Sequence, residues 1–181
     1  LVVGYGSVGQ GLAASARAFG GQVMVAEIDP ARLLQARYDG FIAGSVEALA
    51  PLADVIVTGT GGHHVVPFSA IQRLKDGCFL LNAGHRIDEI ELAPLADLPK
   101  TKALPSVTTY RLASENCIHL FVDGAMANLV GGEGDSLNAF DMTLAVMAEG
   151  IGHIVGDGAL AASGVHLLPR HVWERACPAA A

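Results

Sequence analysis

Gly4-Tyr5-Gly6-Ser7-Val8-Gly9-Gln10-Gly11 is the stretch that decides the fold of this chain. It lies between the apolar run of residues 1–3, which we expect to be a strand, and the helical pattern of residues 12–19. In that setting the spacing G-x-G-x-x-G permits a tight turn, close approach of the backbone to a pyrophosphate, and close packing of the helix on the strand. The helix N-terminus then presents free N–H groups to the anion. The pattern favours a dinucleotide site over a plain glycine turn, and the loop residues that we expect to contact the dinucleotide are Gly4, Gly6, Ser7, Val8 and Gly9.

Composition and charge narrow the class of protein. With 181 residues, 51% of them apolar and 16% charged, and with 22 glycines, the chain matches a compact α/β protein with many short turns. The net charge of -7 argues against nucleic acid as a partner, because a protein that binds the phosphate backbone needs a basic surface. There is no apolar run of about eighteen residues, so we expect no membrane span.

The cysteines indicate a reducing compartment. Cys78, Cys117 and Cys177 are an odd number at wide spacing, with no C-x-x-C pair and no zinc-like pairing to histidine. The charged n-region of a secretory signal is also missing from the residues at hand. We therefore expect a cytoplasmic protein without a metal site.

Strand and helix patterns alternate along the chain and predict an α/β fold. Residues 54–58 form a continuous apolar strand, as expected where a parallel sheet is covered on both faces. We expect a three-layer Rossmann fold with a mostly parallel, doubly wound sheet. Further strands are predicted at 22–27, 40–43, 78–82, 108–112 and 117–122. Helices are predicted at 30–37, 45–53 with Leu49 and Leu52 facing inward, 67–74, 137–151 with a core-packing stripe, and 171–176.

The end of the second strand predicts which dinucleotide is bound. Glu27 stands where a Rossmann second strand places the carboxylate that accepts a hydrogen bond from an adenosine ribose hydroxyl, with Ile28 beside it. The alternative is a surface acid at a strand end. Arg32, in the first turn of the next helix, could reach the 2′-phosphate of NADP, but Glu27 would repel that phosphate. NAD is therefore the favoured cofactor.

Two later loops follow strands at their carboxyl ends, where a ligand binds in this kind of sheet. The first loop is the glycine-rich turn that begins at Gly59, and the second is the turn that contains His85. His85 is the candidate catalytic residue, and the alternative is a hydrogen-bonded turn histidine. Asp88 and Glu89 could orient His85 or cap the next segment.

The adjacent pair His63 and His64 allows two interpretations. The pair could supply metal ligands or a base. Adjacent side chains in an extended segment point in opposite directions, however, which favours a plain loop.

Together these motifs resemble the NAD-binding domain of one family, the S-adenosylhomocysteine hydrolases. The segments that carry the resemblance keep the family's order and spacing over nearly the whole chain. They are residues 4–11, Glu27–Pro30, Val57–Gly61, Asn82–His85, Tyr110–Leu112, Asp123–Leu129 and Gly164–Pro169. The resemblance implies a single NAD-binding domain over residues 1–181. Because the chain opens without Met inside its first strand, we expect a fragment of a larger protein of this type.

The resemblance also implies an activity. In this family bound NAD oxidises the 3′-hydroxyl of S-adenosylhomocysteine, homocysteine is eliminated, water adds, and the hydride returns to leave adenosine. The substrate of the present protein would be that molecule or a related nucleoside. By the same resemblance Asn128 matches an amide that holds the nicotinamide carboxamide, and His85 matches a histidine near the reacting sugar. The resemblance also implies that the two later loops contact the cofactor through Thr58, Gly59, Thr60, Ala83, Gly84 and His85. We also expect a homo-oligomer, because a cut Rossmann unit would expose apolar faces.

Several positions depart from the family pattern. Residues 132–136 read Gly-Glu-Gly-Asp-Ser, where the family has a Gly-His-Pro-Ser motif with its histidine at the substrate site. Asp135 cannot donate a proton at neutral pH as imidazolium does. Ser7 and Gln10 replace an acidic residue and a lysine, and Arg32 replaces an amide. The chain also shows no counterpart of the family's substrate domain or of its Lys- and Tyr-bearing tail, so we expect this chain alone to bind cofactor without turning over substrate.

Three hypotheses follow from these matches and departures. The first is an adenosylhomocysteinase-like enzyme. The second is an NAD-dependent dehydrogenase without hydrolase activity, and the third is a non-catalytic NAD-sensing or partner-binding homologue.

Overall fold

The computed structural model describes residues 1–132, 134, 137–156 and 163–176. By its internal contacts the chain divides into two units, Leu1–Gly132 and Glu133–Ala181. The prediction of one domain over residues 1–181 stays a prediction.

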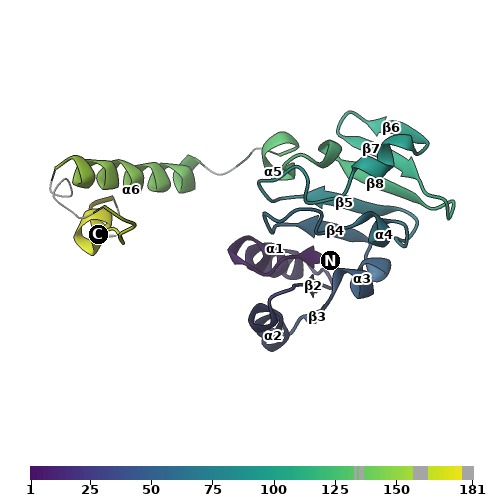
Figure 1. The fold of residues 1–181 in the computed structure, drawn as a ribbon, viewed down its shortest axis with the longest axis horizontal. Coiled ribbons are helices and arrows are strands. Elements are labelled where there is room, and N and C mark those ends of the chain that lie inside the picture. The colour runs from purple at the N-terminus through teal and green to yellow at the C-terminus, as the bar shows by residue number, and fades with distance from the viewer. Residues whose placement is uncertain (133, 135–136, 157–162, 177–181) are drawn as a thin grey trace. The chain divides into compact units, whose positions relative to one another are not determined.

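One eight-stranded sheet forms the centre of the first unit (Figure 1). Its strand order is β3-β2-β1-β4-β5-β8-β7-β6, and neighbours run parallel except that β7 is antiparallel to both β8 and β6. The strands are β1 (Val2–Val3), β2 (Met24–Ala26), β3 (Ile42–Gly44), β4 (Val55–Thr58), β5 (Cys78–Asn82), β6 (Lys100–Leu104), β7 (Val107–Arg111) and β8 (Cys117–Phe121). The order confirms the predicted doubly wound, mostly parallel sheet. It changes direction between β1 and β4, and in such sheets ligands bind at the carboxyl ends of the strands beside that change.

Alternation along the strands places helices on both faces of the sheet. Val2 belongs to one hydrophobic cluster and its neighbour Val3 to the other. Successive side chains of a strand point to opposite faces, so the two clusters lie on opposite faces and give three layers. The cluster of Val2 includes residues of α1 (Ser7–Ala18) and α2 (Pro30–Tyr38), and that of Val3 includes or contacts residues of α3 (Val46–Leu49) and α4 (Phe68–Ile71).

The helices of the first unit begin and end at local signals. At the start of α2, Oδ1 of Asp29 accepts hydrogen bonds from the N–H groups of Ala31 and Arg32 (2.8 and 3.2 Å). The helix predicted at 45–53 is shorter, because α3 stops at Leu49 and a 3₁₀ turn over Ala50–Leu52 follows. Leu49 is buried as predicted. Leu52 lies at the end of that turn and is 57% exposed, so the prediction that it faces inward is wrong.

The strand β6 was not predicted from the sequence. All five of its residues are exposed. It lies at the edge of the sheet, where β7 is its one partner among the described strands. Lysines on an edge strand oppose pairing with another chain. The same lysines interrupt the alternation of apolar and polar residues from which a strand is predicted in a sequence.

The second unit holds α6 (Leu137–Val155) and α7 (Arg170–Trp173), at the positions of the last two predicted helices. Val172 is buried, and Arg175 pairs with Glu149 of α6 at 2.9 Å. Large apolar side chains of α6 such as Phe140 (51%) and Leu144 (49%) remain about half exposed, so the predicted core packing of this stripe is not confirmed. No helix within the described parts of the chain is long and apolar enough to cross a membrane.

Candidate functional site

The glycine-rich loop between β1 and α1 is closely packed. Gly4 has φ +95°, and a Cβ there would lie 2.6 Å from Cγ2 of Thr60. A Cβ on Gly9 would overlap the carbonyl oxygen of Gly4. α1 starts at Ser7 with Gly6 as its N-cap, and no side chain caps it. The first N–H groups of α1 are therefore free to hold an anion, which is what a pyrophosphate needs.

The carboxylate of Glu27 holds this loop against the end of β2. Its Oε2 accepts a hydrogen bond from the N–H of Tyr5 (2.7 Å), and its Oε1 accepts from the N–H groups of Ile28 (2.7 Å) and Asp29 (3.0 Å). A carboxylate offers about four acceptor positions, so one remains for a ribose hydroxyl. Ile28 is 99% exposed at this end of the strand.

The buried side chain of Tyr5 supports the glycine loop, a role that was not predicted from the sequence. Its ring is buried, packs edge-on against Phe41, and its hydroxyl donates to Oδ2 of Asp39 (2.7 Å). Burial, and then the hydrogen bond to Asp39, raise the pKa of Tyr5 to about 12. An aromatic residue inside a glycine-rich motif was the available signal in the sequence.

Arg32 lies beside the glycine loop. Its Nη1 is 3.5 Å from the place that a Cβ on Gly6 would occupy, and the side chain is exposed. The hydrogen bonds and ion pairs found among the described residues do not involve its guanidinium. The arrangement leaves a cation next to the N-terminus of α1, where a dinucleotide phosphate would lie.

The turn after β4 meets the glycine loop, and the turn after β5 meets the turn after β4. A Cβ on Gly59 would lie 3.1 Å from Cγ1 of Val8, and Thr60 contacts Gly4 as described above. The N–H of Ala83 donates to the carbonyl oxygen of Thr58 (2.8 Å). The structure thus brings the three predicted loops together at one edge of the sheet.

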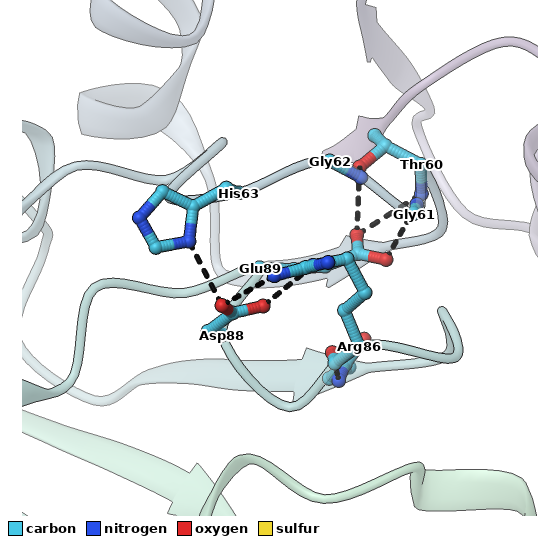
Figure 2. A network of polar contacts seen from close by, with 8 residues as sticks. Thr60, Gly61, Gly62, His63, Arg86, Asp88 and Glu89 are labelled. Carbon is cyan, nitrogen blue, oxygen red and sulfur yellow. Dashed lines mark hydrogen bonds and ion pairs between the residues drawn. The ribbon is translucent and has the colours of Figure 1, made fainter.

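A buried carboxylate, Glu89, fixes the turn after β4 (Figure 2). Glu89 is fully buried. Its Oε2 accepts hydrogen bonds from the N–H (3.0 Å) and the hydroxyl (2.9 Å) of Thr60. Its Oε1 accepts a hydrogen bond from the N–H of Gly61 (2.7 Å). The ring of His85 lies against the same turn, because a Cβ on Gly61 would be 2.7 Å from its Cε1. Neither Asp88 nor Glu89 hydrogen-bonds to His85 in the described structure, so the predicted orienting contact is not found.

Asp88 binds a different histidine from the one that sequence reasoning considered. It forms a two-point ion pair with Arg86 (2.8 Å each) and contacts Nδ1 of His63 at 2.8 Å (Figure 2). Hydrogen bonding to Arg86, and then to His63, holds the pKa of Asp88 well below its usual range.

The expectation that His63 and His64 point in opposite directions is wrong. Their rings stack with centroids 3.7 Å apart, because His64 has φ 48° and the segment is not extended. No group of three metal-binding side chains occurs among the described residues.

Asn82, at the end of β5, joins three of the surrounding segments. Its Oδ1 accepts from the hydroxyl of Thr58 (3.1 Å) and the N–H of Gly84 (2.8 Å), and its Nδ2 donates to the carbonyl oxygens of Arg86 (2.6 Å) and Gly124 (3.0 Å). The whole capacity of this buried amide is used. An amide that ends an otherwise apolar strand was the signal in the sequence.

Asn128 lies farther along the chain but near the same edge. It is an exposed residue of α5 (Ala127–Val130), two positions after Met126, which forms a parallel bridge with Asn82. Asp135 falls outside the described residues. The individual roles of the predicted cofactor and catalytic residues stay predictions.

Comparison with known proteins agrees with this geometry. Residues 1–134 match the family model described as "S-adenosyl-L-homocysteine hydrolase, NAD binding domain". The chain is 35% identical over 176 residues to the adenosylhomocysteinase of Pyrococcus abyssi, covering 96% of this chain and 42% of that protein. It is 36% identical over 172 residues to that of Aeropyrum pernix, covering 94% and 41%. It is also 33% identical over 178 residues to the S-inosyl-L-homocysteine hydrolase of Methanopyrus kandleri, covering 97% and 42%.

The chain spans about two fifths of the length of these relatives. Its match to the family model covers the β-α units that hold the glycine loop, Glu27 and the turns at Thr60 and His85. The cofactor is NAD, and the residues at the carboxyl edge of the sheet fit it. The chain belongs to the S-adenosyl-L-homocysteine hydrolase family and matches its NAD-binding domain.

Proposed function

We propose that the complete protein is an adenosylhomocysteinase-like enzyme. It splits a purine nucleoside thioether, S-adenosylhomocysteine or a close relative such as the inosine analogue, into the nucleoside and homocysteine. One observation carries the proposal: the NAD-fitting loop and the His85 turn lie at one edge of the sheet in a chain whose similar proteins are named hydrolases of such thioethers.

The residues of this chain would bind and orient. The N–H groups at the start of α1 hold the pyrophosphate, and Glu27 accepts from the adenosine ribose. When bound, NAD supplies a reversible acceptor for the hydride of the substrate 3′-carbon, and a 3′-ketone makes the neighbouring C4′ proton acidic enough for the thiolate to leave. His85 is the proposed catalytic residue, because an imidazole on this edge can exchange a proton with the reacting hydroxyl at neutral pH.

The test uses the complete protein with S-adenosylhomocysteine and S-inosylhomocysteine. We expect release of one thiol for each nucleoside formed, with no lasting rise in reduced nicotinamide absorbance. His85→Asn should lower kcat by about a hundredfold or more, as loss of a general acid–base group does. Intact turnover in His85→Asn would remove His85 from the chemistry, and absence of thiol release with both substrates would refute the hydrolase.

The second candidate function is an NAD-dependent dehydrogenase. The sequence of residues 132–136 favours it, because that loop carries no histidine where the family has one. Accumulation of reduced nicotinamide from a nucleoside, without thiol release, is the result that would select it.

A further inference from the structure

We propose that Glu89 is a positioning residue, whose carboxylate fixes the Thr60–Gly61 turn and thereby the place of the His85 ring. The proposal rests on the proposed role of His85 in the reaction. Glu89 itself does not touch the sugar or the nicotinamide in this scheme. Glu89 acts by holding the Thr60–Gly61 turn, which forms one wall of the site.

The backbone of Glu89 is anchored beside the turn that its side chain binds. Its carbonyl oxygen accepts from the N–H of Val66 (3.1 Å), and the next residue, Ile90, forms a parallel bridge with Val66 and is buried. The segment that carries Glu89 therefore runs beside the segment that follows the Thr60–Gly61 turn. The two segments hold the carboxylate beneath that turn.

The carboxylate also packs against the second turn of the site. A Cβ on Gly84 would overlap Oε1 of Glu89. Gly84 directly precedes His85, and the glycine leaves the space that the carboxylate fills. Glu89 thus contacts the turn after β4 by hydrogen bonds and the turn after β5 by packing.

Gly61 transmits the position of the carboxylate to His85. The N–H of Gly61 donates to Oε1 of Glu89 (2.7 Å), while its Cα side faces the imidazole closely enough that an added Cβ would be 2.7 Å from Cε1. Gly61 also has φ +72°, a conformation that a residue with a side chain rarely adopts. Displacement of Gly61 would therefore displace the ring that rests on it.

Among the described residues, the carboxylate of Glu89 is held by hydrogen bonds and forms no ion pair. Its two oxygens accept three hydrogen bonds from the turn, which is the role of a carboxylate. Arg86 supplies a nearby positive charge: its pKa is raised mainly by Asp88 and, in smaller part, by Glu89. Hydrogen bonds to a buried charged acceptor are stronger than those to a neutral one.

The matched pair Glu89→Gln and Glu91→Gln separates positioning from general loss of charge. Both changes replace a carboxylate by an amide on the same segment, and Glu91 accepts one backbone hydrogen bond, from the N–H of Phe68 (2.6 Å). The amide that Glu89→Gln introduces would set an NH₂ group against the N–H donors of the turn. In the complete protein we expect NAD to bind about tenfold more weakly to Glu89→Gln and at most about twofold more weakly to Glu91→Gln.

The ring of His85 gives a readout that a merely structural role would not move. In cofactor-free protein labelled with ¹⁵N, its imidazole signals are assigned by their loss in His85→Gln. We expect those signals to shift in Glu89→Gln and to stay in place in Glu91→Gln. Unchanged His85 signals and unchanged NAD affinity in a folded Glu89→Gln protein would overturn the proposal, as would equal effects of the two substitutions.

A second variant reaches the same carboxylate if Glu89→Gln does not fold. Gly84→Ala keeps Glu89 and displaces its Oε1 by the added methyl group. It should shift the His85 signals in the same way, and a folded Gly84→Ala protein with unshifted signals would refute the coupling. Because the NMR readout needs no turnover, failure of hydrolase activity would leave this result standing and would count against the proposed function alone.

Discussion

Gly9 and Gly11 are two residues apart on α1, yet the same substitution should act on them in opposite directions. A methyl group at Gly9 meets the carbonyl oxygen of Gly4, whereas at Gly11 nothing lies within 4 Å. We expect Gly9→Ala to lower the free energy of unfolding by about 1–3 kcal/mol, the usual result of overpacking, and to weaken NAD binding.

Gly11→Ala is the matched control. It should raise the free energy of unfolding by about 0.5–1 kcal/mol, because alanine is the better helix former at an open position. Urea unfolding and NAD titration measure both variants. A Gly9→Ala protein as stable as Gly11→Ala would contradict the packing seen at the loop.

Arg32 tests whether the cation beside the loop serves the cofactor. Arg32→Asn should weaken NAD binding by about fivefold at low salt, and the loss should shrink as salt is raised, because an exposed charge is screened. Arg37→Asn removes the same charge from the same helix, where the guanidinium contacts the carbonyl oxygen of Ala43 (3.2 Å). Equal weakening in both variants would show that only the net charge matters.

Tyr5 makes stability depend on alkaline pH. The folded protein keeps the phenol proton until about pH 12, because its pKa is raised, while the unfolded chain loses the proton near the ordinary tyrosine pKa of 10.0. Unfolding therefore releases a proton in this window, so the stability due to Tyr5 is complete below about pH 10 and is lost as the pH rises toward 12. Tyr5→Phe should unfold with a flatter pH dependence above about pH 9.5, as urea titrations at several pH values would show; an unchanged slope would rule out the assignment.

At the scale of elements, Asn82 is the joint between β4, β5 and the 3₁₀ turn Val122–Gly124. Asn82→Ala leaves several buried partners without a hydrogen bond, each of which costs about 1–3 kcal/mol. Asn116→Ala is the milder comparison, since Asn116 makes one such bond, to the carbonyl oxygen of Leu74 (2.9 Å). We expect a loss of unfolding free energy of about 3 kcal/mol or more for Asn82→Ala and about 1 kcal/mol for Asn116→Ala, measured in urea. If Asn82→Ala lowers the free energy of unfolding no more than Asn116→Ala does, then Asn82 does not join these elements.

The elements that were predicted correctly from the sequence are those whose own residues show an apolar pattern or a capping signal. The strands β4 and β5 are short apolar runs, and α2 carries its Asp-Pro start signal. β6 escaped prediction because an edge strand rich in lysine and threonine has no buried face to show. α3 was predicted too long because Pro51 was not weighed as the start of a new turn.

The site was predictable where one segment makes it and unpredictable where distant segments meet. The glycine loop and Glu27 follow from a known spacing. Glu89 does not, because its partners Thr60 and Gly61 lie 29 and 28 residues away, and nothing local shows that its carboxylate is buried. The His63–Asp88 contact was equally hidden, because the two residues are 25 positions apart in the sequence. The left-handed backbone of His64, which allows the two histidine rings to stack, is also not visible in the sequence.

For the whole first unit, the buried thiol of Cys78 can report global unfolding. Cys78 has no exposed surface, and burial raises its pKa to about 11, so the reactive thiolate is scarce in the folded protein. Cys117, at the start of β8, is less buried and should react faster. In a Cys177→Ser background, thiol labelling of Cys78 at about pH 8 should slow further when NAD is added, because a ligand that binds only the folded state stabilises it. Labelling of Cys78 as fast as that of Cys117, or unaffected by NAD, would contradict this picture.

The joint at Asn82 also sets an order of events during synthesis of the chain. The glycine loop is made before the other walls of the site, but the amide that ties those walls needs Gly124, whose carbonyl oxygen lies 42 residues farther along. A nascent chain that ends before β8 would hold the glycine loop and the turns after β4 and β5, but it would lack the carbonyl oxygen of Gly124 that Asn82 binds. Cofactor loading should therefore wait until about two thirds of these residues have been translated, which makes NAD capture a sign that the sheet is complete.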